Sequence, residues 1–510
     1  MLARIFTVGG YTLLSRLTGF ARDVMLAAIL GAGPMADAFF VALRLPHHFR
    51  TIFAEGAFKV AFVPAYAHVR GERGEASAKL FANRIFTLLF ISQLVLLVLA
   101  WAFMPQAMSI LAPGYSEDVA QRNLAIELTR ITFPYLLLTT LVALYGGMLN
   151  VMHRFATVAA APIFLNISMM ATLALAAFFP GVGHAAAWGV LISGFLQYFL
   201  LAGDLALHGG LPRLARVSLD EDIGAFLAAL GPATLGSMGT QVALFADTII
   251  ATFLPAGSLS ALYYADRVNQ LPVGVIGTTI ATVLLPEMSR QLATHDHEGA
   301  MQSQRRAFNF ILLVSVPFVA AFLTVPDVIM RAMFTRGAFS RVDADIAGAT
   351  LSAYAIGLIP FVLIHSAVAT FYARKDTATP MKAALIGVAV NVGLKIALVG
   401  ALAQVGLALA TAIGAWTDLL LVLGFAVRAG YLFRPDRILL RSLVKFSTSG
   451  VLLGGSLWLA ARFAAAHLST LASFRDETVL ALLVAVGTVV YVGSILLLFG
   501  LKWLHSLVRN

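Results

Sequence analysis

Apolar runs long enough to cross a membrane recur from one end of this 510-residue chain to the other. We count about fourteen of them, each of about 20 residues, the length at which a helix spans a hydrocarbon core of about 30 Å. The runs are continuous and do not alternate with period two, so they indicate helices and not the strands of a barrel. The composition agrees, because 60% of the residues are hydrophobic and 12% are charged. The sequence therefore predicts an all-α polytopic membrane protein without a soluble domain.

The basic residues between the apolar runs predict the orientation of the chain. With the N-terminus inside, the cytoplasmic segments hold most of them, including Arg70, Arg73, Arg305 and Arg306, whereas the opposite loops hold far fewer. Because cytoplasmic loops of membrane proteins carry the excess of Lys and Arg, we expect both termini in the cytoplasm. The net charge of +10 then reflects this topology and attraction to anionic headgroups. The phospholipid membrane is therefore an expected partner, and nucleic acid is not.

An internal repeat predicts how the helices are arranged. Residues 23–33 match residues 247–257 at Asp, Ala, Leu, Ala and Gly, and the register continues with little drift to Pro134 and Pro360. Since the repeat begins again after an even number of helices, its two copies should be related by an axis along the membrane normal. We expect two pseudo-symmetric six-helix lobes, residues 1–215 and 216–430, facing each other across a central cavity, as in an alternating-access transporter.

The last part of the chain, residues 431–510, has no counterpart in the repeat. It contains two apolar runs with few polar residues along their length. We expect these two helices to be appended to the lobes, where they are free for another task such as holding a lipid tail in a groove.

Four arginines interrupt the two most apolar stretches at the start of the chain: Arg16 and Arg22 in the first, Arg44 and Arg50 in the second. A guanidinium at bilayer depth costs about 3 kcal/mol or more, so such residues usually face a protein interior or a watery cavity. Arginine binds anions well and is a poor acid or base. The pattern therefore predicts a cationic cavity and favours transport over catalysis.

Motifs for energy coupling, catalysis and metal binding are missing from the sequence. It has no G-x-x-x-x-G-K-[ST] phosphate loop, no G-x-S-x-G nucleophile elbow, no H-E-x-x-H pair and no cysteine. We expect a transporter and not an enzyme, with no metal and no cofactor. Without ATP, the membrane potential is the expected driving force, since an outward-moving negative charge releases about 2.3 kcal/mol per 100 mV, and a diphosphate with two charges about 5.

Several runs of residues are distinctive enough to indicate a family. They are Ser15–Asp23, Gly31–Gly33, Ala36–Ala42, Leu45–Pro46, Phe53–Phe58, Phe62–Pro64, Tyr263–Arg267 and Leu284–Pro286. In these runs, and over nearly its whole length, the chain closely resembles the MurJ (MviN) family of lipid II flippases of the MOP exporter superfamily. The resemblance implies a fourteen-helix fold in the bacterial cytoplasmic (inner) membrane. The implied substrate, lipid II, is an undecaprenyl-diphosphate-linked disaccharide pentapeptide that moves from the inner to the outer leaflet for peptidoglycan synthesis.

The resemblance also implies a binding site for the diphosphate. The family positions that match Arg16, Arg22, Arg50 and Arg267 serve the anionic headgroup, and we expect Arg22, Arg50 and Arg267 to converge on it from both lobes, because arginine forks engage phosphates bidentately. Supporting or gating roles are expected for further residues, which are Asp23, Asp37, Arg44, Glu55 and Asp266.

Other interpretations of these residues stay open. Arg22 and Asp23 could form a simple ion pair at a helix end, and Arg44 and Arg50 could snorkel toward the cytoplasmic interface. Asp37 could neutralise an arginine and hold its helix in register, and Glu55 could pair with an arginine or act as a gate latch.

A second site is implied by four polar residues in the second half of the chain. In some relatives the positions of Asp247, Asn391, Lys395 and Thr411 bind a monovalent cation, with an acid where this chain has Lys395. A lysine ammonium could occupy the place of the ion and pair with Asp247, so we expect an ion pair and no sodium site here. Independent snorkelling of Lys395 is the alternative.

Three other functions remain compatible with the sequence. A flippase for another polyprenyl-linked glycan would share the arginines, a cation-coupled multidrug exporter would share the fold, and a receptor or scaffold would bind the lipid without moving it. The charged linkers at 70–79, 208–222, 290–305 and 428–441 could contact cell-wall synthesis proteins, although solvated loops are the simpler interpretation.

Overall fold

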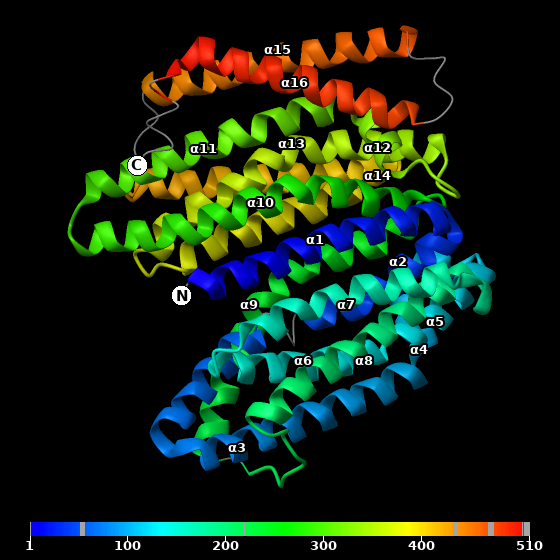
Figure 1. Cartoon of the computed structure of the whole chain (residues 1–510), viewed down its shortest axis with the longest axis vertical. Helices are drawn as coiled ribbons and strands as arrows, with labels where there is room; N and C mark the ends of the chain where they lie inside the picture. Colours follow the sequence, from blue (N-terminus) through cyan, green and yellow to red (C-terminus); the bar gives the residue numbers. More distant parts are fainter. Residues whose placement is uncertain are drawn as a thin grey trace. The chain divides into compact units, whose positions relative to one another are not determined.

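The computed structural model of the chain describes residues 2–51, 57–218, 220–431, 437–467, 474–501 and 503. Throughout these ranges the regular structure is helical and no strand occurs, which confirms the predicted all-α class (Figure 1). Within them, nine helices are long and apolar enough to cross a membrane. The chain is therefore a multi-pass membrane protein, and the number of fourteen spans stays a prediction.

The elements follow one another with short connections. In chain order they are α1 (Leu2–Leu30), α2 (Pro34–Arg50), α3 (Ala57–Ala102), α4 (Met104–Leu111), η2 (Pro113–Ser116), α5 (Val119–Thr132), α6 (Pro134–Val151), α7 (Phe155–Ala174), η3 (Ala176–Phe178), α8 (Val182–His208), α9 (Glu221–Ala251), α10 (Ser258–Ala293), α11 (His297–Thr324), α12 (Pro326–Phe334), α13 (Arg341–Tyr372), α14 (Ala378–Arg428), α15 (Arg437–His467) and α16 (Arg475–Phe499).

Two of these helices are each interrupted by a sharp break. In α3 the break is at Gly74, where φ is 81°, and in α14 it is at Ala403, where φ is 47°. Both values lie in the left-handed region, which a continuing α-helix does not visit. The two halves of α14 pack against each other, because a Cβ added at Gly414 would lie 2.7 Å from the Cβ of Asn391. Each of these two elements therefore contains two helices.

Packing divides the chain into two compact units. Unit 1 comprises Met1–Ser260 with Arg336–Phe339, and unit 2 comprises Ala261–Thr335 with Ser340–Asn510. The short segment Arg336–Phe339 belongs to unit 1 because the Ala338 N–H donates to the Ala28 carbonyl at 2.7 Å. The boundary near residue 260 differs from the repeat boundary at 215 by one long helix, α9.

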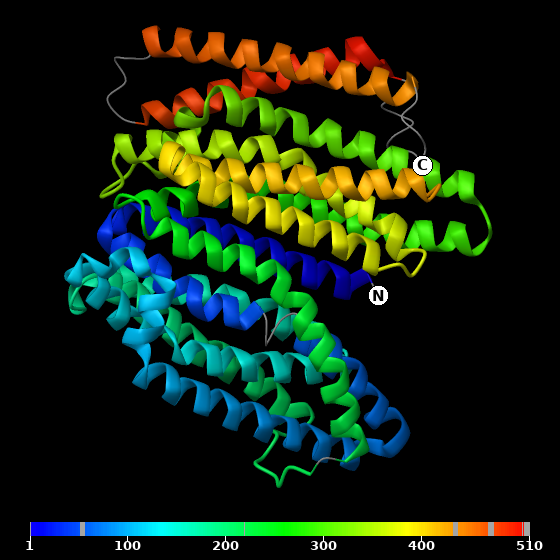
Figure 2. The ribbon, with the colours of Figure 1, turned by 180° about the vertical axis from the view of Figure 1, so that it is seen from behind.

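An aromatic core holds α9 in unit 1. Phe226 of α9 makes edge contacts with Phe58, Phe62 and Phe81 of α3, and Phe58 and Phe62 stack with their ring centres 5.1 Å apart. Figure 2 shows α9 running beside α3. In the sequence α9 begins the second copy of the repeat, but its side chains pack on the first copy.

In unit 2, α15 and α16 form an antiparallel pair that contacts the rest of the unit through α11 and α12 (Figure 1). The Tyr491 hydroxyl of α16 donates to the Leu313 carbonyl of α11 at 2.7 Å. On the pair, an open groove of about 590 Å³ is lined mainly by apolar side chains, among them Val451, Leu459 and Val489. Its expected role in holding a lipid tail stays a prediction.

Candidate functional site

Arg22, one of the predicted anion-binding arginines, is held by polar neighbours on α1 and α7. It lies on α1 with only 9% of its surface exposed, and its Nη2 is 2.7 Å from Oδ1 of Asp23. Its Nη1 donates to Oδ1 of Asn166 on α7 at 3.0 Å. The Asn166 amide is oriented in turn, because its Nδ2 donates to the Ser15 carbonyl and to the Thr18 hydroxyl, both at 3.0 Å. The Asp23 carboxylate and the Asn166 amide therefore fix the plane of the Arg22 guanidinium.

The other arginines of unit 1 occupy different environments. Arg16 is exposed on α1. Arg44 of α2 is half-buried, with Nη1 3.4 Å from the Thr248 hydroxyl of α9. Arg50, also half-buried at the end of α2, donates from Nη1 to the Tyr135 hydroxyl of α6 at 3.0 Å. Arg44 and Arg50 each have a neutral hydroxyl partner within unit 1.

Asp37 of α2 has partners that the sequence did not predict. It is 3% exposed and accepts hydrogen bonds from the Gly257 N–H at 2.6 Å, the Ser260 N–H at 2.8 Å and the Ser260 hydroxyl at 2.5 Å. These donors lie at the start of α10, where backbone N–H groups lack helical partners. A carboxylate in this position satisfies them and is favoured by the helix dipole. Asp37 thus joins α2 to the beginning of α10.

Two predicted residues lie in unit 2, on α10. The Arg267 guanidinium lies over the Tyr263 ring, 4.7 Å from its centre, in a cation–π contact. Asp266 accepts a hydrogen bond from Nε2 of Gln270 at 3.3 Å. The expected convergence of Arg267 with the arginines of unit 1 on one diphosphate stays a prediction. Glu55 lies outside the described residues.

The residues of the predicted ion-pair site are divided between the units. Asp247 is half-buried on α9 in unit 1. Asn391, Lys395 and Thr411 lie on α14 in unit 2, where Lys395 is fully buried and Thr411 donates to the Leu407 carbonyl at 3.0 Å. The pairing of Lys395 with Asp247 and the absence of a sodium site stay predictions.

A cavity inside unit 1 contains polar residues that the sequence did not single out. It has a volume of about 140 Å³ and lies between α2, α3, α6, α7 and α8. Its polar lining consists of Arg50, Lys59, Tyr135, Thr139 and Gln197. Lys59 interrupts an apolar run of the sequence. The criterion that identified the arginines, a charge inside an apolar run, would therefore also have identified Lys59. Gln197 carries no such signal, because a single neutral amide in an apolar helix is common.

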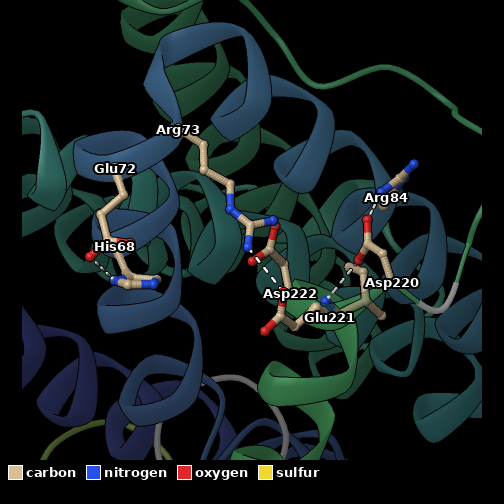
Figure 3. A network of polar contacts seen from close by, with 8 residues as sticks. His68, Glu72, Arg73, Arg84, Asp220, Glu221 and Asp222 are labelled. Atoms are coloured by element: carbon tan, nitrogen blue, oxygen red, sulfur yellow. Dashed lines mark hydrogen bonds and ion pairs between the residues drawn. The ribbon is translucent and has the colours of Figure 1, made fainter.

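Ion pairs join α3 to the start of α9. Five residues make these pairs, and we call them the α3–α9 clasp: Arg73, Arg84, Asp220, Glu221 and Asp222. Arg73 donates to Asp222 at 2.9 Å and to Glu221 at 3.2 Å, and Arg84 pairs with Asp220 (Figure 3). Asp220 also caps α9, because its Oδ1 accepts from the Ile223 N–H at 3.1 Å. In this clasp two predicted linkers, 70–79 and 208–222, approach each other within unit 1.

Known proteins resemble the chain over nearly its whole length. The family model described as lipid II flippase MurJ matches residues 26–476. The probable lipid II flippase MurJ of Rhizobium meliloti is 37% identical over 493 residues, which cover 95% of this chain and 92% of that protein. The lipid II flippase MurJ of Burkholderia cenocepacia is 32% identical over 469 residues, which cover 90% of each.

Two solved structures show the same fold. A structure of lipid II flippase MurJ in an inward closed conformation has a TM-score of 0.81 at 24% identity and covers 96% of this chain and 98% of that chain. An inward-facing multidrug resistance MATE family transporter of the MOP superfamily has a TM-score of 0.68 at 16% identity, covering 83% and 97%. Family model, identity and coverage agree, and the chain belongs to the MurJ family of lipid II flippases.

Proposed function

We propose that this chain is a lipid II flippase. It moves the undecaprenyl-diphosphate-linked precursor of peptidoglycan from the inner to the outer leaflet of the bacterial cytoplasmic membrane by alternating access. The observation that carries this proposal is the family match over residues 26–476, together with 37% identity to a probable flippase of this kind. Flipping makes and breaks no covalent bond, so the proposal needs no catalytic residue, metal or cofactor.

The diphosphate is proposed to bind to Arg22, Arg50 and Arg267, with Arg16 nearby on α1. The buried Arg22 supports this assignment, because Asp23 and Asn166 fix its guanidinium before any ligand arrives. A fixed donor loses little entropy on binding. Asp23 also neutralises part of the charge of Arg22, which weakens anion binding and favours release of the substrate.

Orientation and partners complete the proposal. Both termini lie in the cytoplasm, as the distribution of Lys and Arg predicts. Lipid II and the surrounding phospholipids are the partners in the membrane. Cell-wall synthesis proteins are further candidates, with the segments around 290–305 and 428–441 as their contact surfaces.

Leaflet exchange of lipid II tests the proposal. The experiment uses cells depleted of their native flippase and supplied with this chain, with its Arg22→Ala or Arg267→Ala variant, or with Lys382→Ala, which removes an exposed lysine near the start of α14. We expect exchange with the parent and with Lys382→Ala, and loss of exchange with the other two variants at equal membrane levels.

The alternatives give different results in the same cells. A receptor or scaffold would bind lipid II without exchange, and a flippase for another glycan lipid would exchange only that lipid. A drug exporter would lower the accumulation of a cationic dye and leave lipid II in the inner leaflet. Any of these results from a well-inserted parent chain would overturn the proposal.

A further inference from the structure

We propose that Lys59 binds the diphosphate of lipid II together with Arg50. The inference rests on the proposed function and adds a cation to the same site. Both side chains line the cavity of unit 1, Arg50 from the end of α2 and Lys59 from the start of α3. Lys59 is not among the residues that the family resemblance assigns to the headgroup, so its assignment depends on the structure.

Lys59 lies deep in the membrane-spanning part of α3. Fifteen residues separate it from the break at Gly74, which corresponds to about 22 Å of helix at 1.5 Å per residue. Exposed charged residues such as Glu72 and Glu75 surround this break and mark an aqueous end of the helix. A lysine side chain is too short to cover this distance, so Lys59 cannot place its charge among the headgroups there by snorkelling.

No counter-charge for Lys59 is found in the part of the chain that the structure describes. The side chain is half-buried and makes no hydrogen bond or ion pair with those residues. Among the residues described around the cavity, none of the lining side chains is acidic. A partly buried charge is costly unless it is paired, and so an anion that enters the cavity would supply the missing partner.

Arg50 identifies the anion, because the diphosphate is already proposed to bind this arginine. Its Nη1 donates to the Tyr135 hydroxyl at 3.0 Å, and Tyr135 lines the cavity as well. The guanidinium is therefore held at the cavity wall. A phosphate group has several acceptor oxygens and can bind a guanidinium and an ammonium at once. Since both cations line one cavity, one phosphate group can contact both.

The size of the cavity sets how much of the substrate it can hold. Its volume of about 140 Å³ corresponds to roughly four or five waters at about 30 Å³ each. This is room for one phosphate group, whereas the prenyl chain, the sugars and the peptide must stay outside. We therefore assign Lys59 to one of the two phosphate groups.

The test measures binding of two lipids to the full chain in detergent. They are undecaprenyl diphosphate and undecaprenol, which share the prenyl chain and differ in the diphosphate. We expect Lys59→Met to weaken binding of the diphosphate about tenfold, because one charge-assisted hydrogen bond is lost, and to leave binding of undecaprenol unchanged. Lys59→Arg should keep most of the parent affinity. Lys382→Met, which removes an exposed lysine of α14, is the matched control.

The outcomes separate this inference from the proposed function. Equal affinities of the parent and Lys59→Met for undecaprenyl diphosphate would overturn the inference and leave the proposed function intact. Equal losses for both lipids would show a general distortion of the lipid site and would also overturn it. A parent that binds the diphosphate through Lys59 without exchanging lipid II between leaflets would overturn the proposed function and not the assignment of Lys59.

Thermal unfolding without ligand tests for a partner inside the chain. Removal of a charge that has no partner should leave the midpoint unchanged or raise it, whereas removal of one member of a buried ion pair lowers it. We therefore expect Lys59→Met to unfold at the parent temperature or above. A lower midpoint would mean that a carboxylate of this chain, such as Glu55, already neutralises Lys59, and would overturn the inference.

Discussion

Asn166 is a neutral residue that orients the charged side chain of Arg22. Its Oδ1 accepts from Arg22, and its Nδ2 is anchored to α1 by the Ser15 carbonyl and the Thr18 hydroxyl. A hydrogen bond that involves a charged group contributes about 1.5–3 kcal/mol. Without it, Arg22 keeps its ion pair with Asp23 but loses the contact that sets its direction. In the proposed diphosphate site, Asn166 would act on the substrate through Arg22.

We predict that Asn166→Ala slows lipid II exchange about tenfold, because about 1.4 kcal/mol of positioning is lost. Initial exchange rates in proteoliposomes measure this effect, and Asn123→Ala, at an exposed asparagine of α5, is the control. A folded Asn166→Ala variant with the parent rate would mean that Asp23 alone orients Arg22.

Gly414 and Gly424 lie on the same half of α14 but differ in their surroundings. A Cβ at Gly414 would lie 2.7 Å from the Cβ of Asn391 and 3.0 Å from the Gly387 carbonyl oxygen, whereas at Gly424 it would meet nothing within 4 Å. We predict that Gly414→Ala lowers the free energy of unfolding by about 1–3 kcal/mol through overpacking. Gly424→Ala should be neutral or raise it by up to about 1 kcal/mol. Thermal unfolding in detergent compares the two, and equal midpoints would show that the halves of α14 separate without cost.

At the scale of the element, the start of α9 depends on one carboxylate that makes two interactions. Asp220 caps the helix through the Ile223 N–H and pairs with Arg84 of α3. The Arg84–Asp220 pair is partly exposed, and surface ion pairs contribute up to about 1 kcal/mol, whereas an N-cap contributes about 1 kcal/mol and up to about 2 kcal/mol. The cap should therefore contribute more than the ion pair to the stability of the first turn of α9. The ion pair should contribute more to the packing of that turn against α3.

Amide hydrogen exchange in the first turn of α9 separates these two contributions. We predict that Asp220→Ala accelerates exchange most, that Arg84→Ala has a smaller effect, and that Asp220→Ser, which keeps a capping oxygen without the charge, behaves like Arg84→Ala. Asp118→Ala is a matched control, because Asp118 caps α5 through the Gln121 N–H and its effect should stay in α5. Equal effects of Asp220→Ser and Asp220→Ala would mean that the cap contributes nothing.

At the scale of the whole molecule, the sequence could predict the class and the family because both depend on local signals. Continuous apolar runs indicate membrane helices, and the runs around Arg16, Arg22 and Arg50 are distinctive over short stretches. The unit to which α9 belongs could not be predicted in this way. The repeat shows which segments correspond in sequence, whereas the position of α9 depends on Phe226 fitting among aromatic side chains of α3.

The candidate site shows the same limit. Arg22 was identified because a charge in an apolar run is costly. Asn166, which bonds to Arg22, and Gln197, which lines the cavity of unit 1, were not identified, because neutral amides carry no such cost signal. The partner of Asp37 was also missed, since backbone donors such as the Gly257 N–H have no signature in sequence. Polar contacts between distant segments require the packing of the helices to be known first.

The proposed driving force, the membrane potential, acts on the molecule as a whole, because its contribution depends on the net charge that crosses the membrane with the substrate. Two uncompensated charges would release about 5 kcal/mol at 100 mV, and any positive charge that moves with them subtracts from this. Arg22 reduces this net negative charge only slightly, because Asp23 on the same helix lies 2.7 Å away and balances its positive charge.

We therefore predict that lipid II exchange in proteoliposomes accelerates as an imposed potential, negative on the side from which lipid II leaves, is raised with ion gradients held constant. The dependence of the logarithm of the initial rate on potential gives the effective charge, which should lie between zero and two negative charges. Asp23→Asn should reduce it, because the charge of Arg22 is then unbalanced. A rate that does not change with potential in the parent would exclude the membrane potential as the driving force, and a coupling ion or removal of the product would have to supply the energy.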